Sequence, residues 1–245
     1  TTEIYTLSLH DALPICRQTG AAMLCSHSVQ EIADLSPMAH LLAINSSSPV
    51  IDFFDGFRTS HEIQNVEFVD DENWKELLDL EKVEEFRKRA LNPHGHAVTR
   101  GGAENDDICF QGREAQNVHE ANIVTEAEKL FKQVSELTGR TYAPFVYYGA
   151  KDATKVIIAM GSVTETAHEV IDDLMAKGEK VGMVKVHLYR PFSAKHLIAA
   201  IPSTVTKIAV LDRTKELGSL GEPLYLDVVR SEEHTSELQS RLHLV

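Results

Sequence analysis

Cysteine is scarce in this sequence, and the three cysteines present, Cys16, Cys25 and Cys109, lie far apart. A disulfide framework needs paired cysteines, and the common zinc sites need cysteines or histidines at close spacing. A [4Fe-4S] cluster takes about four grouped thiolates. The pattern therefore excludes a disulfide-stapled domain, predicts that no metal is bound, and fits a chain of the reducing cytoplasm.

Basic residues are also few, because 24 Lys and Arg stand against 37 Asp and Glu, for a formal net charge of −13. Nucleic acid and anionic membrane both select clustered Lys and Arg, so this balance argues against either partner. No apolar run approaches the ~20 residues of a transmembrane helix. The start also lacks the basic and then apolar pattern of a secretory signal. We therefore expect a cytoplasmic protein.

What the sequence does contain is a set of short runs rich in Val and Ile in its second half. The runs 155–160, 180–186 and 207–212 are too short for helices and are flanked by Gly or polar residues. This pattern predicts three buried strands.

Two helices are expected between these strands. Ser162 and Glu165 have the spacing of a capping box, and Gly178 stands where a left-handed residue closes the helix. A second helix is expected to begin at Ser193 and end at Pro202. Alternating strands and helices predict a parallel sheet with right-handed crossovers.

The first half repeats this pattern once. Residues 20–25 and 49–54 are predicted strands, and the helix between them runs from Ser28 to about Asn45. Ser28 and Glu31 again have capping-box spacing. Strand, helix and strand predict a second parallel pair.

The middle of the chain is polar. Residues 67–90 are expected to be helical, and residues 92–116 show no periodicity and carry Pro, Gly and charges. So long an irregular segment is unusual in a compact domain, which suggests that it lies on a partner surface. Residues 122–137 predict an amphipathic helix that links the two halves.

Two motifs carry a resemblance to a known family. RPF at 190–192 followed by a helix and by IAVLDRTKE, and PVIDFFDGFRTSHEIQ at 49–64, resemble pyruvate:ferredoxin oxidoreductase, a thiamine-diphosphate enzyme. Leu217 departs from the proline expected in the turn after RTKE. The resemblance implies two parallel-sheet α/β units. The first is the truncated end of a thiamine pyrimidine-binding domain, and the second is similar to the C-terminal domain of transketolase.

The resemblance also implies an activity for the parent enzyme. That enzyme oxidatively decarboxylates pyruvate with coenzyme A, giving acetyl-CoA, carbon dioxide and reduced ferredoxin or flavodoxin. Its thiamine diphosphate, magnesium and [4Fe-4S] clusters are expected in other parts, so this internal fragment should bind none of them, hold no catalytic residue and be inactive alone. Its partners should be the remaining domains of the parent chain, and the parent is expected to be a homodimer.

Alternative functions stay open. A related 2-oxoacid:ferredoxin oxidoreductase is an intermediate possibility. A stand-alone binding or assembly subunit with a transketolase-like fold and no chemistry is the alternative from another class.

Four candidate site residues follow the strand predicted at 49–54: Arg58, Thr59, Ser60 and His61. Ligands in parallel α/β sheets bind beyond the carboxyl ends of strands, so these residues are candidates for contacting an anionic substrate or thiamine. In the alternative interpretation, which the pattern favours, Thr59 and Glu62 cap the next helix and Arg58 makes a structural ion pair.

Two further candidates, Arg213 and Lys215, follow the strand predicted at 207–212. They could hold an anionic group or a neighbouring domain, or could form a local salt-bridge network. His94 and His96 flank a glycine but have no third ligand nearby, so they are interpreted as surface histidines.

Both ends of the chain match translated DNA of a common sequencing adapter. Thr1–Ile15 and Arg230–Ser240 translate such DNA without a mismatch and are set aside from the fold. The expected division of the chain is an artefact at 1–15, pyrimidine-domain end with excursion at 16–120, linker helix and connection at 121–150, transketolase-C-like domain at 151–229, and artefact at 230–245.

Overall fold

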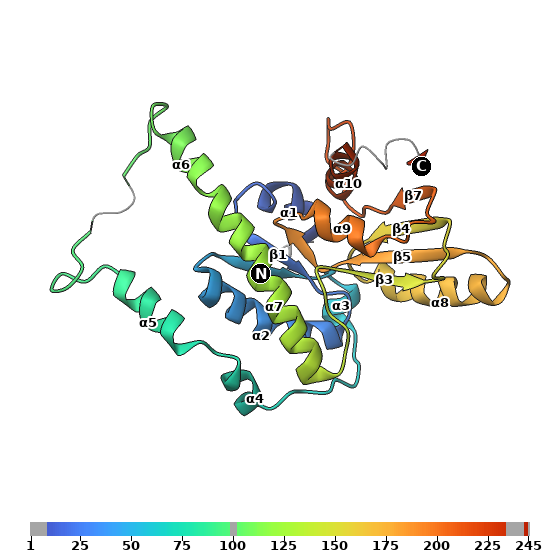
Figure 1. Ribbon diagram of the computed structural model, residues 1–245, viewed down its shortest axis with the longest axis horizontal. Coiled ribbons are helices and arrows are strands. Elements are labelled where there is room, and N and C mark those ends of the chain that lie inside the picture. The colour runs from blue at the N-terminus through green and yellow to red at the C-terminus, as the bar shows by residue number, and fades with distance from the viewer. Residues whose placement is uncertain (1–8, 99–101, 234–242, 245) are drawn as a thin grey trace, which may run out of the picture.

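The computed structural model describes residues 9–98, 102–233 and 243–244, and Figure 1 shows two sheets flanked by helices. The elements in chain order are α1 (Leu9–Cys16), β1 (Ala22–Cys25), α2 (Val29–Ser46), β2 (Val50–Phe53), α3 (Arg58–His61), α4 (Asp71–Glu76), α5 (Leu80–Arg89), α6 (Cys109–Ala115), α7 (Asn117–Thr138), β3 (Phe145–Gly149), β4 (Lys155–Ala159), α8 (Val163–Ala176), β5 (Val181–Val186), β6 (Leu188–Arg190), α9 (Ala194–Ala200), β7 (Lys207–Val210), α10 (Pro223–Glu233) and β8 (His243–Leu244).

The first sheet has the strand order β2-β1-β6. β1 and β2 are parallel, with Ala22 opposite Val50, which confirms the pairing that strand, helix and strand predicted. β6 joins on the other side of β1 and is antiparallel to it, with Leu24 opposite Leu188.

The second sheet has the order β3-β5-β4-β7-β8. β4 is parallel to both β5 and β7. In these pairs Lys155 lies opposite Val181 of β5 and Lys207 of β7. The predicted parallel arrangement of these three strands is confirmed. β3 was not expected as a strand, and it forms an antiparallel edge on β5. The α/β fold class is therefore confirmed, with an antiparallel edge strand added to each sheet.

The chain passes directly from one sheet to the other. Only His187 separates β5 from β6, and its carbonyl oxygen accepts a 2.7 Å hydrogen bond from the Cys25 backbone N–H in β1. The segment expected as a separate transketolase-C-like unit thus contributes a strand to the first sheet. A single residue cannot act as a flexible linker, so the two sheets are held against each other.

Two buried clusters reflect this arrangement. The larger one joins both sheets and includes Met23, Cys25, Phe53, Val156, Ile158, Val184, Val186 and Tyr189. The other lies on the opposite face of the first sheet, where α2 and α7 cover it, and includes Leu24, Leu35, Leu42, Ile123, Leu130 and Phe131. The expected amphipathic helix at 122–137 is present as α7, and its apolar face is buried here.

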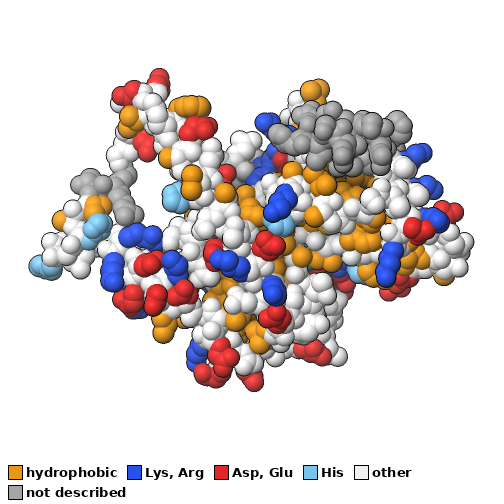
Figure 2. Space-filling view, viewed as in Figure 1, with side chains coloured by type: hydrophobic (Ala, Val, Ile, Leu, Met, Phe, Trp, Pro, Cys, Tyr) orange, Lys and Arg blue, Asp and Glu red, His pale blue; other side chains and the backbone are white. Residues whose placement is uncertain are grey.

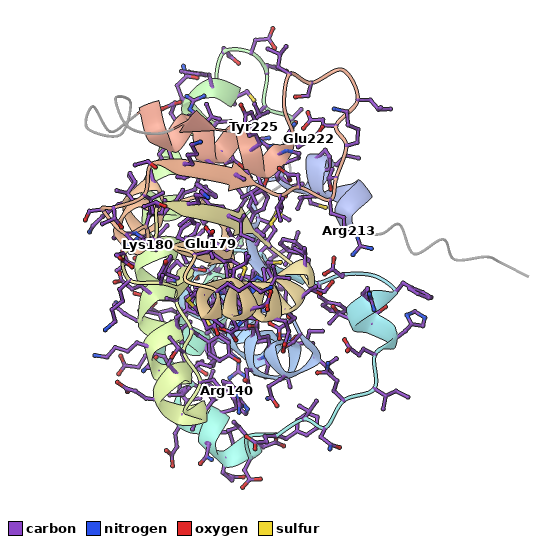
Figure 3. The ribbon with its side chains drawn as sticks, turned by 90° about the vertical axis from the view of Figure 1, so that its right-hand side faces the viewer. Arg140, Glu179, Lys180, Arg213, Glu222 and Tyr225 are labelled. Atoms are coloured by element: carbon purple, nitrogen blue, oxygen red, sulfur yellow. The ribbon has the colours of Figure 1, made fainter. Side chains whose placement is uncertain are left out.

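A buried carboxylate fastens α2 to the segment after α7. The Asp34 side chain is 1% exposed and accepts hydrogen bonds from Arg140 Nε at 2.7 Å and Arg140 Nη2 at 3.0 Å. It also accepts one from the Tyr142 hydroxyl at 2.6 Å. Arg140 lies at the end of α7, where Gly139 closes the helix in the left-handed conformation (Figure 3).

Of the capping boxes predicted for α2 and α8, the one at α2 is confirmed in part and the one at α8 is absent. At α2, Ser28 Oγ accepts from the Glu31 N–H as predicted, although Glu31 returns its bond to the N–H of His27 rather than of Ser28. At α8 the prediction was wrong. Ser162 is already helical and makes no side-chain cap, and Glu165 pairs with Lys185 at 2.9 Å. The Asp55 carboxylate, from the first half of the chain, accepts the Ser162 N–H at the start of α8.

The polar segment of residues 67–116, here named the excursion, loops away from the sheets in Figure 1 and carries α4, α5 and α6. The helical stretch expected at 67–90 is split into α4 and α5, and the irregular segment expected at 92–116 contains α6. Among the described residues, no helix is long and apolar enough to cross a membrane.

The segment before Cys16 contributes a side chain to the core. Leu13 in α1 is 2% exposed and belongs to the larger cluster. The expectation that residues 1–15 add little to the core is therefore wrong for Leu13. The adapter origin of this segment stays a prediction, as does that of 230–245, most of which lies outside the described residues.

Candidate functional site

Four parallel strands end at one cleft of about 590 Å³. The residues that line it follow the carboxyl ends of β1 (His27, Ser28), β2 (Asp55, Arg58), β4 (Met160, Ser162) and β7 (Leu211, Asp212, Arg213). Ligands of open α/β sheets bind at such strand ends, and here the ends of both sheets contribute. Figure 3 shows Arg213 on the same side of the molecule as α3.

Asp55 is the centre of this cleft wall. Its side chain is 2% exposed, and its Oδ1 accepts a 3.0 Å hydrogen bond from Arg213 Nη1. Its Oδ2 accepts from the backbone N–H of Ser162. A carboxylate at a helix start satisfies a free N–H and interacts favourably with the helix dipole. Asp55 thus ties the end of β2 to the start of α8 and to the loop after β7.

Gly161 allows this close approach. Its φ is +83°, and a Cβ there would lie 2.7 Å from Asp55 Oδ2. Real Cβ atoms do not come so near, so a side chain at this position must displace the Asp55 carboxylate. From the sequence, Gly161 and Ser162 could hold an anion through the free N–H groups of a helix start, although ordinary capping was the favoured interpretation.

We expect Gly161→Ala to lower the free energy of unfolding by about 2 kcal/mol, of which about 1 kcal/mol is the cost of a left-handed alanine. Gly178→Ala is the matched control, because Gly178 has φ +85° and open space around its Cβ. Urea denaturation of both variants measures the difference. Equal losses would show that Asp55 moves aside at no cost.

The four candidates after β2 do not act together. Arg58 is exposed and lines the cleft, whereas Thr59 is buried with its hydroxyl unpartnered among the described residues. Ser60 Oγ lies 2.8 Å from His61 Nδ1, and both side chains are exposed outside the cleft. Only Arg58 therefore reaches the predicted site.

The alternative interpretation of these residues was also wrong. Thr59 and Glu62 do not form a capping box at the start of α3. The Phe57 N–H at that start donates to Ser60 Oγ. Phe57, with φ +69°, is the N-cap of α3, Thr59 is buried within the helix, and Glu62 is its C-cap. Within the described part of the chain, Arg58 forms no ion pair.

The two candidates after β7, Arg213 and Lys215, pair with different parts of the chain. Arg213 reaches across to Asp55 of the first half, so it lies at the contact between the halves. Lys215 pairs with Glu222 in its own loop. Asp212 accepts the N–H groups of Leu224 and Tyr225 and so holds the start of α10. Burial raises the pKa of Asp212, and these N–H groups act in the opposite direction.

His94 and His96 lie in the excursion, and His94 is exposed. They lie outside the cleft and belong to no group of potential metal ligands among the described residues. Asp55 was not among the candidate residues predicted from the sequence, and Ser162 was a candidate only for holding an anion at the helix start. The position of Asp55 directly after a predicted strand was the available signal.

Comparisons with known proteins match both halves of the chain. Residues 5–132 match the family described as pyruvate flavodoxin/ferredoxin oxidoreductase, thiamine diphosphate-binding. The chain belongs to the pyruvate flavodoxin/ferredoxin oxidoreductase family. Residues 153–242 match the pyruvate:ferredoxin oxidoreductase core domain II. The resemblance read from the RPF and DGFRTSHE motifs is confirmed.

Individual members of this family show how much of an enzyme the chain represents. It is 57% identical over 212 residues to pyruvate-flavodoxin oxidoreductase of Enterobacter agglomerans, covering 86% of this chain and 18% of that relative. It is 50% identical over 219 residues to pyruvate:ferredoxin oxidoreductase of Moorella thermoacetica, covering 89% of this chain and 19% of that relative. The chain therefore spans less than a fifth of the length of these relatives.

Proposed function

We propose that this chain is an internal segment of a pyruvate:ferredoxin (flavodoxin) oxidoreductase. The whole enzyme would convert pyruvate and coenzyme A to acetyl-CoA and carbon dioxide and reduce ferredoxin or flavodoxin. The observation that carries the proposal is the pair of successive family matches, which meet at a cleft built from the strand ends of both matched segments. The partners of the segment would be the remaining domains, in a homodimeric enzyme of the cytoplasm.

Within that enzyme, Arg58 is the residue of this chain best placed to contact an anionic group. It lines the cleft and keeps its charge free among the described residues, whereas the charge of Arg213 is paired with Asp55. A guanidinium can bind a carboxylate or phosphate through two N–H groups at once. We assign Arg58 to binding, and Asp55 and Arg213 to holding the cleft wall.

The donors of this chain do not fit the enzyme's other groups. Cys25 is buried next to acidic residues, and burial raises its pKa well above the usual range, so it is a poor cluster ligand. The Asp55 carboxylate already accepts from Arg213 and Ser162, which leaves it poorly available to the magnesium of a diphosphate. We expect the isolated chain to bind neither thiamine diphosphate nor an iron–sulfur cluster.

The excursion offers a surface for the missing domains. Figure 2 shows apolar side chains among the charged ones over α5 and α6. Large exposed apolar side chains of this region are Phe68, Leu80, Phe86, Leu91, Ile108 and Phe110. Exposed apolar groups on this scale mark contact sites, in keeping with a segment of a longer chain.

A chimeric enzyme tests the role of Arg58. Residues 16–229 would replace the matching segment of the Enterobacter agglomerans relative. In this chimera we expect Arg58→Ala to raise the KM for pyruvate about tenfold or more, because a hydrogen bond to a charged group is worth about 1.5–3 kcal/mol.

Lys215→Ala is the control, since Lys215 carries the same charge but pairs with Glu222 outside the cleft. Steady-state kinetics with pyruvate at saturating coenzyme A give KM and kcat for each variant. Unchanged KM and kcat in the Arg58→Ala chimera would contradict the assignment of Arg58 to substrate binding.

A further inference from the structure

Three potential metal ligands meet in the interior between the two sheets. His27 follows β1, Glu31 lies in the first turn of α2, and His187 is the residue that joins β5 to β6. The side chains of the two histidines are 0% and 1% exposed, and that of Glu31 is 13% exposed. One ligand atom from each lies within 4.8 Å of the others.

Backbone carbonyls fix the tautomer of both histidines. His27 Nε2 lies 3.0 Å from the Val186 oxygen, and His187 Nδ1 lies 3.1 Å from the Ala143 oxygen. A carbonyl oxygen only accepts, so these two nitrogens carry the hydrogens. The other nitrogen of each neutral ring, His27 Nδ1 and His187 Nε2, therefore presents a lone pair.

Both lone-pair nitrogens face the same carboxylate oxygen. Glu31 Oε2 lies 3.3 Å from His27 Nδ1 and 3.3 Å from His187 Nε2. Neither nitrogen has a hydrogen-bond partner among the described residues. Three electron-rich atoms thus converge in a buried space. Glu31 Oε2 accepts a 2.8 Å hydrogen bond from the His27 backbone N–H, but no described donor reaches either ring nitrogen, an arrangement that is costly unless a cation is shared by all three.

The nearest basic side chain does not supply that cation. Lys185 Nζ lies 3.8 Å from Glu31 Oε1, which is the other carboxylate oxygen, and 2.9 Å from Glu165 Oε1. The charge of Lys185 is therefore shared with Glu165 on the far side of the Glu31 carboxylate.

We propose that His27, Glu31 and His187 bind a divalent transition-metal ion, with Zn²⁺ the best fit. In a tetrahedral site with bonds of about 2.0–2.1 Å, neighbouring ligand atoms lie about 3.3 Å apart, and both measured distances have this value. Metal-binding histidines typically donate their second ring N–H to a carbonyl or carboxylate, as both rings do here.

The ion would have a structural role. It would join the turn before α2 to the crossing between β5 and β6, the point at which the chain passes from one sheet to the other. None of its ligands is assigned to substrate, but His27 also lines the cleft, so the metal site adjoins the proposed oxidoreductase site.

The test uses the full 245-residue chain, stripped of metal with a chelator and then titrated with Zn²⁺ against a chromophoric competitor. We expect one equivalent to be retained on dialysis and to raise the melting temperature. X-ray absorption of the zinc-loaded wild-type chain should show nitrogen and oxygen ligands, two of them imidazole, and no sulfur.

Two variants separate this site from adventitious binding. His27→Gln should lower the affinity for the single retained Zn²⁺ by about 100-fold or more. His40→Gln should leave this affinity unchanged, because His40 is an exposed histidine of α2. Failure of the wild-type chain to retain zinc, a sulfur ligand in the absorption spectrum, or full retention by His27→Gln would overturn the proposal. The first result would mean that a proton is the shared cation.

Discussion

Asp34→Ala is expected to lower the free energy of unfolding by about 3 kcal/mol or more. Among the residues that the structure describes, the substitution leaves the Arg140 guanidinium, which is 27% exposed, with only the exposed Glu67 as an acidic partner. It also leaves the buried Tyr142 hydroxyl without its acceptor. Removing one member of a buried ion pair typically costs about 3–5 kcal/mol, because the remaining charge stays desolvated.

Urea denaturation followed by circular dichroism measures this loss. Asp173→Ala is the control, since Asp173 pairs with Lys177 on the exposed face of α8, with both side chains at least 60% exposed. That substitution should change stability by about 0.5 kcal/mol or less. If the two variants lost the same stability, the Asp34 network would not hold α2 to the end of α7.

Stability is also expected to fall steeply above pH 10, and Tyr142 is expected to cause part of the fall. Burial raises the pKa of Tyr142 well above its usual range, and the hydrogen bond to Asp34 raises it further. Below pH ~10 both the folded and the unfolded chain keep this proton, so the contribution is fully present. Above it the unfolded chain ionises first, and stability is lost by up to about 1.4 kcal/mol per pH unit.

Tyr142→Phe isolates this contribution. The variant should be less stable at pH 8, because the hydrogen bond to Asp34 is lost, but its stability should fall less steeply between pH 10 and 12. Other buried tyrosines, such as Tyr189, keep their own slope in both proteins. Tyr148→Phe is the surface control, because the Tyr148 hydroxyl also donates to a carboxylate, Asp172 Oδ1 at 2.6 Å, but is exposed to water. Identical slopes for wild type and Tyr142→Phe would show that Tyr142 ionises freely in the folded chain.

The sequence predicted those features that depend on neighbours along the chain. The Val and Ile runs of β4, β5 and β7 and their parallel order followed from strand length and from the intervening helix. The end of the helix expected at 122–137 lies one residue from the observed end at Thr138, after which Gly139 caps α7 in the left-handed conformation. Arg58 was one of four candidates because it follows a strand, although a structural ion pair was the favoured interpretation, and its side chain lines the cleft.

The features that the sequence could not predict depend on distant partners. Ser162 and Glu165 have capping-box spacing, yet Asp55, 107 positions before Ser162, takes over the helix start. Asp34 and Arg140 are 106 positions apart, and His27 and Val186 are 159 apart. β6 has three residues and its side chains give no periodicity, so only its pairing with β1 defines it.

The most direct test of the proposed function is the activity of the unsubstituted chimera. Residues 16–229 replace the matching segment of the Enterobacter agglomerans relative, and reduction of flavodoxin is followed with pyruvate and coenzyme A, with 2-oxoglutarate as the competing substrate. We expect the chimera to reduce flavodoxin with pyruvate at a rate within about tenfold of the parent. A chimera that folds and carries its full cofactor content, yet turns over no pyruvate, would contradict the assignment of this chain to a pyruvate-oxidising enzyme.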